Sequence, residues 1–162
     1  MFRLHISQLG NPEKAADSYA YATMLDKNHW AALANLGAVL HDELKNPAEA
    51  LAAYTRAYEI LTQKDAKPAD PPPNPPLILS QLQYRIGLAI RYDSRRKCAM
   101  EDNPEKEVPC SELAANAFSL ALKYDPGNES AHHMLATVTA DYTMKRASNE
   151  YIKQSFEDYA EK

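Results

Sequence analysis

The sequence contains few glycines and has no long hydrophobic or basic run. Only four of the 162 residues are glycine, which argues against the glycine-rich loop of a nucleotide-binding enzyme. The longest basic run is "RRK" (Arg95 to Lys97) and the net charge is -4, so we expect no nucleic-acid partner. No apolar stretch is long enough for a membrane span or a signal peptide, which predicts a cytoplasmic or nuclear protein with no membrane partner.

Residues that would carry chemistry are also sparse. The two cysteines, Cys98 and Cys110, lack the paired spacing of a zinc site, and in the cytosol we expect reduced thiols. A disulfide between them under oxidation is the alternative. The histidines are scattered along the chain: His5, His29, His41, His132 and His133. No motif places a nucleophile beside a base. We therefore expect no metal, no cofactor and no catalytic residue, and so a chain that is not an enzyme.

The chain is rich in helical periodicity interrupted by turn residues. The stretch "LALKYDPGN" (Leu120 to Asn128) leads an apolar helical pattern into Asp-Pro-Gly-Asn. Pro126 and Gly127 both favour the end of a helix, which should stop near Tyr124. Apolar residues resume at helical spacing soon after Glu129. The sequence therefore predicts a tight joint between two helices.

A small-large-small triplet at positions i, i+4 and i+7 occurs three times. The copies are Ala15-Tyr19-Ala22, Ala50-Tyr54-Ala57 and Ala114-Phe118-Ala121. The first two copies lie 35 residues apart at every position and the last two 64 apart, so the excess must be inserted sequence. Gly37 in "NLGAVL" and Gly87 in "RIGLAI" precede two of the copies. Small residues let two helices approach closely, and the aromatic residue fills the space between neighbouring units.

These motifs resemble the tetratricopeptide repeat family, in which Leu-Gly lies on the first helix of a pair, Ala-aromatic-Ala on the second, and Asp-Pro at the end. The resemblance implies an all-α fold, a right-handed solenoid of antiparallel helix pairs with about three and a half to four repeats and two insertions. It implies a single domain over residues 1–162. The expected repeats are 1–28 (truncated), 29–63, 77–126 (with an inserted loop, 95–109) and 129–162 (atypical, capping the stack).

The two insertions differ in composition. Residues 64–76 form a proline-rich connector, in which "KPADPPPNPP" (Lys67 to Pro76) carries six of the eleven prolines. We expect an extended spacer there, with a ligand for a proline-reading domain as the alternative. The insertion from Arg95 to Pro109 is mostly charged, which predicts a flexible surface loop.

The resemblance also implies a concave groove lined by the first helix of each pair. Carried over residue by residue, the groove includes Asn35, His41, Gln81, Tyr84, Arg85, Leu88, Arg91 and His133. Some family members hold the terminal carboxylate of chaperones with Lys, Asn and Arg at such positions. Only Asn35 and Arg85 match that set, and no lysine does, which argues against this ligand.

The predicted function is a protein–protein interaction scaffold that binds a peptide or partner segment bearing an acidic group. Tyr84, Arg85 and Arg91 would supply an aromatic and basic patch, since tyrosine and arginine dominate many interfaces and arginine grips carboxylates. The alternative is that these arginines pair with local acids such as Asp93 or Glu112.

Two further hypotheses concern the ends of the chain. The segment "EYIKQSFEDYAEK" (Glu150 to Lys162) resembles the junction to a class I S-adenosylmethionine-dependent methyltransferase domain in proteins that fuse one to these repeats. It implies that the chain is the substrate-recognition module of a methyltransferase whose catalytic domain lies beyond residue 162. At the other end, a truncated first repeat would expose Phe2, Leu4 and Ile6, which favours homo-oligomerisation.

Overall fold

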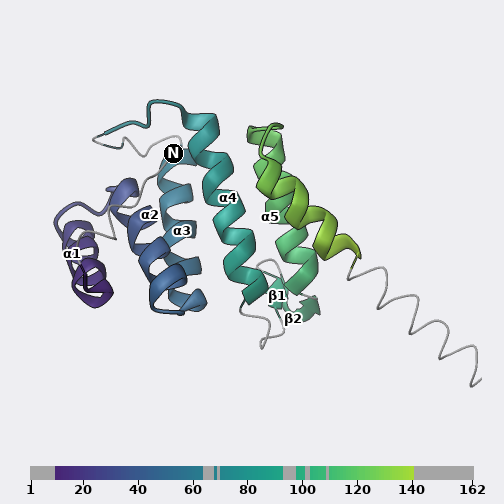
Figure 1. The fold of residues 1–162 in the computed structure, drawn as a ribbon, viewed down its shortest axis with the longest axis horizontal. Helices are drawn as coiled ribbons and strands as arrows, with labels where there is room; N and C mark the ends of the chain where they lie inside the picture. Colours follow the sequence, from purple (N-terminus) through teal and green to yellow (C-terminus); the bar gives the residue numbers. More distant parts are fainter. Residues whose placement is uncertain are drawn as a thin grey trace, which may run out of the picture.

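The computed structural model describes residues 10–63, 68, 70–92, 98–100, 103–108 and 110–140, and these are mainly helical. The helices are α1 (Pro12–Leu25), α2 (Trp30–Ala38), the π-helical turn η2 (Val39–Glu43), α3 (Pro47–Thr62), α4 (Pro75–Tyr92), α5 (Cys110–Tyr124) and a helix over residues 129–140. They lie one after another in a row, and α1 to α5 each contact the next helix in the sequence (Figure 1). The prediction of a helical fold is confirmed.

Asparagine followed by proline begins three of these helices. Asn11, Asn46 and Asn74 each accept a hydrogen bond from the backbone N–H three residues later, at 3.0, 3.3 and 3.4 Å. Proline suits the following position because its missing N–H would have no partner in the first turn. At Asn74 this signal overrides the expected extended conformation. The helix α4 begins at Pro75, so the last two prolines of the connector are helical.

The Asp-Pro-Gly-Asn joint ends one helix and begins the next within four residues. The helix α5 stops at Tyr124, as predicted. Asp125 Oδ1 then accepts a hydrogen bond from the Gly127 N–H at 3.0 Å, and the Asn128 N–H donates to the Asp125 carbonyl at 3.1 Å. Asn128 Oδ1 accepts from the Ala131 N–H at 3.0 Å and caps the helix over residues 129–140.

Two glycine–aromatic contacts hold the helix pairs together. A Cβ atom on Gly37 would lie 2.7 Å from Tyr54 Cε1, and one on Gly87 would lie 2.5 Å from Phe118 Cε1. Both distances are too short for a real contact, so only glycine allows each ring its place. The alanines on either side of these rings are fully buried: Ala50, Ala57, Ala114 and Ala121. The triplets thus mark the surfaces where α3 packs on α2 and α5 packs on α4.

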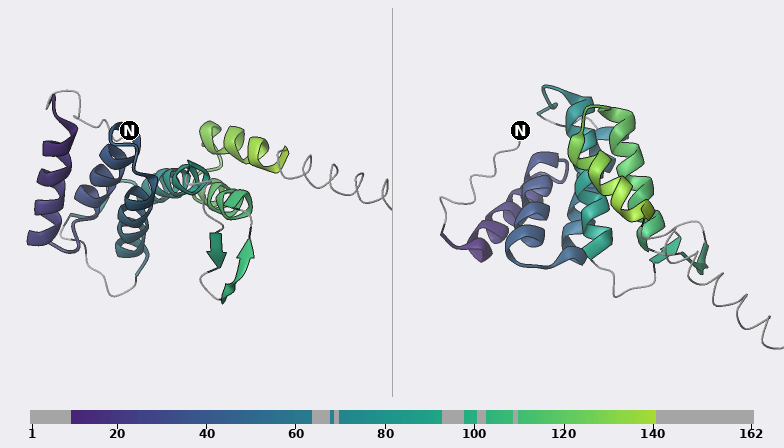
Figure 2. Two further views of the ribbon diagram at one scale, coloured as in Figure 1. Left: turned by 90° about the horizontal axis from the view of Figure 1, so that it is seen from below. Right: turned by 45° about the vertical axis from the view of Figure 1, so that its right-hand side comes forward.

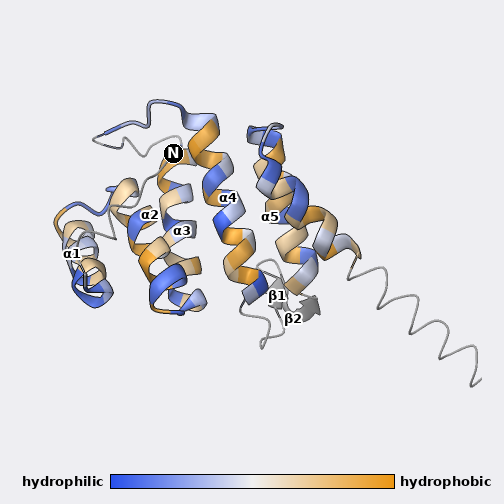
Figure 3. Cartoon of the chain, viewed as in Figure 1, coloured by the Kyte–Doolittle hydropathy of each residue, from blue (hydrophilic) through white to orange (hydrophobic). Residues whose placement is uncertain are grey.

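The buried side chains form two clusters. The first joins α2, α3 and α4 and includes Trp30, Ile60 and Leu82. The second joins α5 to the helix over residues 129–140 through Phe118 and Val138. Figure 3 shows the hydrophobic segments of α2, α3 and α4 and the hydrophilic connector that precedes α4.

The connector is tied to the start of α2. The indole Nε1–H of Trp30 donates a hydrogen bond to the backbone carbonyl of Asp70 at 2.6 Å, across 40 residues of sequence. Residues 71–74 then lead to the first turn of α4 without forming a helix.

The predicted loop between α4 and α5 contains two paired strands instead. The strands β1 (Cys98–Met100) and β2 (Asn103–Val108) are antiparallel, with Cys98 opposite Val108 and Met100 opposite Asn103. This hairpin extends away from the row of helices (Figure 2). Backbone pairing across a short reversal can form in a strongly charged segment, because it needs no apolar face.

The expectation of reduced cysteines is wrong for this structure. Cys110, the first residue of α5, is disulfide-bonded, and the only other cysteine in the chain is Cys98. Sequence spacing alone gave no measure of the distance between the two residues in space.

Candidate functional site

One face of α4 carries five of the eight residues predicted for the groove. These residues recur at helical spacing and are all half-buried: Gln81, Tyr84, Arg85, Leu88 and Arg91. The opposite side of the helix contributes Leu82 and Ile86 to the first buried cluster. Tyr92, which is 68% exposed, ends the same face. We call these six residues the α4 strip, which contains two tyrosines and two arginines.

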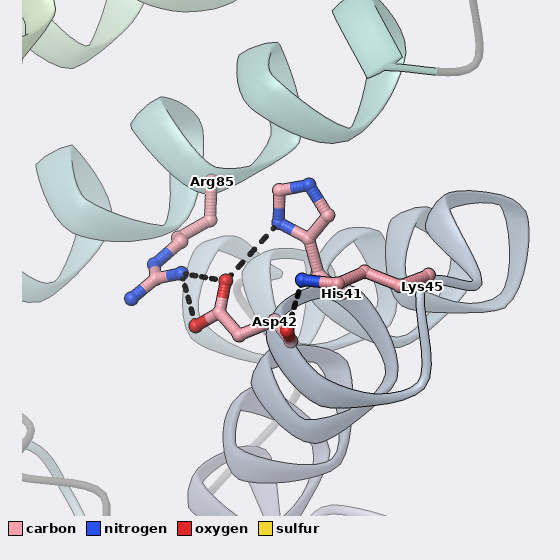
Figure 4. Close-up of polar contacts among 4 residues, drawn as sticks. All are labelled: His41, Asp42, Lys45 and Arg85. Carbon is pink, nitrogen blue, oxygen red and sulfur yellow. Dashed lines mark hydrogen bonds and ion pairs between the residues drawn. The ribbon is translucent and has the colours of Figure 1, made fainter.

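Arg85 in this strip forms an ion pair with Asp42 in η2 (Figure 4). Its Nη1 donates to Asp42 Oδ1 at 3.0 Å and to Oδ2 at 2.8 Å. The side chains are 31% and 39% exposed, so both remain in contact with solvent. The sequence suggested Glu112 or Asp93 as partners, and Asp93 lies outside the described residues. Asp42 lies 43 residues before Arg85, and the pair therefore connects two successive helix pairs.

The π-helical turn η2 places Asp42 opposite Arg85. Its wider turn is closed by the Leu44 N–H, which donates to the Val39 carbonyl at 3.0 Å, five residues back. Lys45 follows with a φ of 53°, a left-handed conformation that reverses the chain. The Lys45 ammonium donates to the backbone carbonyl of Asp42, which ties this reversal to η2 (Figure 4). Such turns are frequent at functional sites.

His41, predicted for the groove, lies beneath the ion pair and is only 9% exposed. Its Nδ1 is 3.6 Å from Asp42 Oδ1, beyond hydrogen-bond distance, and has no hydrogen-bond partner among the described residues. Its ring meets that of Tyr92 edge to face, with centroids 5.4 Å apart. Burial lowers the pKa of His41, although the nearby Asp42 carboxylate opposes the shift. The imidazole is therefore neutral at pH 7.

Tyr54 brings a second neutral group to this cluster. Its side chain is 1% exposed, and the hydroxyl has no hydrogen-bond partner among the described residues. Burial raises the pKa of Tyr54 far above its ordinary value, with Arg85 opposing the shift. The charges at the centre of the cluster are thus Arg85 and Asp42, and two buried neutral side chains, His41 and Tyr54, support them.

The other end of the α4 strip contacts the helix over residues 129–140. Arg91 Nη1 lies 3.8 Å from Met134 Sδ, in hydrogen-bond geometry. Tyr84 leans on Phe118, with ring centroids 5.9 Å apart. Leu88 and Met134 are half-buried against the second cluster. This end of the strip is therefore apolar and aromatic, with one arginine.

Two predicted residues lie apart from these contacts. Asn35 is half-buried and His133 is exposed, and neither side chain hydrogen-bonds to another described residue. Three residues of the observed cluster were not predicted from the sequence, namely Asp42, Tyr54 and Tyr92. Only Tyr92 carried a sequence signal, because it lies four residues after Leu88 on the same helical face.

Two hypotheses fall outside the described residues. Glu150 to Lys162, which carry the resemblance to a methyltransferase junction, and Phe2, Leu4 and Ile6, on which homo-oligomerisation would depend, are not among them. Within the described ranges, no helix is long and apolar enough to cross a membrane. Nor do the described His, Cys, Asp and Glu side chains form a group of three that could hold a metal ion.

No protein-family model and no curated protein sequence matches this chain. The resemblance to tetratricopeptide repeats thus remains a prediction supported by the residues named above.

Proposed function

We propose that this chain is a protein–protein interaction scaffold of stacked, tetratricopeptide-like helix pairs. It binds a peptide or partner segment along the first helices of its pairs, with the α4 strip at the centre. The ligand carries an acidic group that reaches Arg85.

The observation that carries this proposal is the accessibility of the α4 strip. A helix packed between two neighbours usually exposes little of its surface, yet Tyr84, Arg85, Leu88 and Arg91 are only half-buried and Tyr92 is 68% exposed. Tyrosine and arginine are the residues that most often dominate binding energy at interfaces. Partly buried side chains also lose less conformational freedom on binding than fully mobile ones.

The acidic character of the ligand follows from the guanidinium of Arg85. Its Nη1 donates to both oxygens of Asp42, so this guanidinium already holds a carboxylate in the free protein. Arginine can bind a carboxylate through two parallel hydrogen bonds, a geometry that also fixes the direction of the ligand.

The experiment is an affinity capture from native lysate, read by quantitative mass spectrometry, with three forms of the chain. The test form carries Tyr84→Ala, Arg85→Ala and Arg91→Ala. The matched control carries Tyr21→Ala, Arg56→Ala and Lys123→Ala, which remove the same kinds of side chain from exposed positions on α1, α3 and α5. Circular dichroism establishes that both are folded.

A partner retained by the unsubstituted chain and the control, and lost by the test form, supports the proposal. That partner must then bind the purified chain directly, with the same dependence on the α4 strip. Equal capture by all three forms would contradict the proposed binding surface.

A further inference from the structure

Arg85, the cation that we propose binds the ligand, is already paired with an acid of the same chain, Asp42. We propose that Asp42 is an internal competitor: it occupies Arg85 in the free protein, and a ligand binds fully only when its own acidic group displaces Asp42. This inference rests on the proposed function and adds a specificity-determining residue to it.

The exposure of the two side chains makes this exchange feasible. Asp42 is 39% exposed and Arg85 31%, so neither charge is sealed from water. An ion pair at this exposure contributes at most about 1 kcal/mol, since water solvates both partners when it opens. Asp42 can therefore leave Arg85 at a cost that one good ligand contact offsets.

The hydrogen bonds leave room for an incoming carboxylate. A single nitrogen of Arg85, Nη1, donates to both oxygens of Asp42. An incoming carboxylate that pairs with Nη1 and with a second nitrogen, Nη2, displaces Asp42. Two parallel bonds replace a forked contact from one nitrogen, which favours the ligand.

The neighbours of Asp42 stabilise its displaced form. The Lys45 ammonium lies at the Asp42 backbone carbonyl and has three donors, so it can donate to the carboxylate once the latter turns away from Arg85. On the other side, His41 and Tyr54 are neutral and cannot replace the lost positive charge. Arg85 is thus paired with Asp42 in the free protein and with the acid of the ligand in the complex.

Competition by Asp42 affects ligands differently according to their charge. A segment without an acid leaves the ion pair closed and contacts only the aromatic and aliphatic part of the strip. A basic segment is opposed by Arg85 itself. Asp42 thus lowers the affinity for every acidic ligand by the cost of opening the pair and leaves ligands without an acid unaffected, so it narrows the affinity difference between the two.

The test uses a phage library of random short peptides selected on the unsubstituted chain. The selected peptide and its Glu→Gln or Asp→Asn counterpart are then measured by fluorescence polarisation against Asp42→Asn, Arg85→Gln and the double variant. The control is Glu59→Gln on α3, which removes an equal charge from the exposed Arg56–Glu59 pair, 3.1 Å apart. Circular dichroism and a second substitution, Asp42→Ser, separate loss of competition from loss of fold.

We expect selected peptides to contain an acid and to bind Asp42→Asn roughly three- to fivefold more tightly than the unsubstituted chain. Glu59→Gln should leave the affinity unchanged, and the gain should vanish when Arg85→Gln is also present. Equal or weaker binding by Asp42→Asn, or an equal gain without Arg85, would overturn the inference while leaving the proposed function standing. If the unsubstituted chain selects no peptide, the proposed function fails and the inference fails with it.

Discussion

The helix pairs α2–α3 and α4–α5 share one packing contact and differ in its polarity. In each pair an aromatic ring lies against a glycine, Tyr54 on Gly37 and Phe118 on Gly87. Tyr54 adds a hydroxyl, which is buried without a described hydrogen-bond partner close to Arg85 of the next pair. Phe118 adds none, and its neighbours Val138 and Tyr84 form a largely apolar cluster.

The comparison distinguishes the contact that holds each helix pair together from the polar groups that are present at one pair and not at the other. The ring and the glycine are common to both pairs and determine how closely their helices approach. The polar cluster of His41, Asp42 and Arg85 lies only at the α2–α3 end, where the π-helical turn presents Asp42 to α4. The polar contacts that the proposed function uses are therefore an addition to a packing contact that both pairs share.

The largest effect should come from removing the apolar ring. Phe118→Ala deletes a side chain that is 0% exposed, and we expect a loss of about 3–5 kcal/mol in the free energy of unfolding. Urea denaturation followed by circular dichroism measures it. Ser119→Ala, at the exposed neighbouring position, should have little effect. A loss below about 1 kcal/mol would mean that the ring is not closely packed.

Filling the glycine position should have the next largest effect. Gly87→Ala places a Cβ 2.5 Å from the Phe118 ring, and we expect a net loss of about 1–3 kcal/mol despite the better helix propensity of alanine. Adding Phe118→Leu should relieve part of the strain, so the double variant is more stable than the sum of the single losses predicts. Strict additivity in urea denaturation would refute a direct clash.

Exchanging the two aromatic residues tests the polarity difference directly. Phe118→Tyr buries a hydroxyl among apolar neighbours and should cost about 1–3 kcal/mol, whereas Tyr54→Phe removes an unpaired hydroxyl and should change stability by less than about 1 kcal/mol, towards greater stability. Thermal and urea unfolding of both variants provide the comparison. A marked loss on Tyr54→Phe would show that the Tyr54 hydroxyl is satisfied in solution.

The smallest expected effect is on the pH dependence of stability, through the buried side chain of His41. The folded protein lowers the pKa of His41 below the ordinary value of 6.5, chiefly through burial. The unfolded chain therefore binds the proton more readily, so this contribution to stability is complete above about pH 6.5 and decreases as the pH falls towards the folded-state pKa. The difference in urea midpoint between pH 7.5 and 5.5 should be smaller in His41→Phe than in the unsubstituted chain.

His41→Phe keeps an aromatic ring beside Tyr92 and leaves the other histidines of the chain in place. An unchanged pH dependence in the variant would indicate that His41 does not titrate in this range.

Much of the fold could be predicted because its signals are local. Asn11-Pro12 and Asn46-Pro47 begin helices through side-chain caps, and Asp125 to Asn128 end one helix and begin another. The same signal at Asn74-Pro75 was masked by the surrounding prolines, which were interpreted together as extended chain. Local capping chemistry decided that boundary, not overall composition.

The candidate site was only partly predictable because its central contact is not local. Helical spacing placed Tyr84, Arg85 and Leu88 on one face, but no spacing relates Arg85 to Asp42, 43 residues earlier. The π-helical turn that presents Asp42 depends on the reversal at Lys45, a lysine in a conformation that favours glycine. The charged insertion gave no alternation of apolar residues, so its strands had no sequence signature.

The hydrogen bond from Trp30 to Asp70 limits the conformational freedom that the proline-rich insertion would otherwise give to α4. A flexible segment of this length would ordinarily let the following helix pair take many positions, and fixing it would cost conformational entropy. Since the indole holds the Asp70 carbonyl at 2.6 Å, only residues 71–74 separate a fixed point on the second pair from the start of α4. Three of those four residues are prolines, whose φ angles are already restricted. Residues 71–74 thus form a short, stiff link between Asp70 and α4, so a change in chain length before Asp70 should not alter how α4 packs against α3.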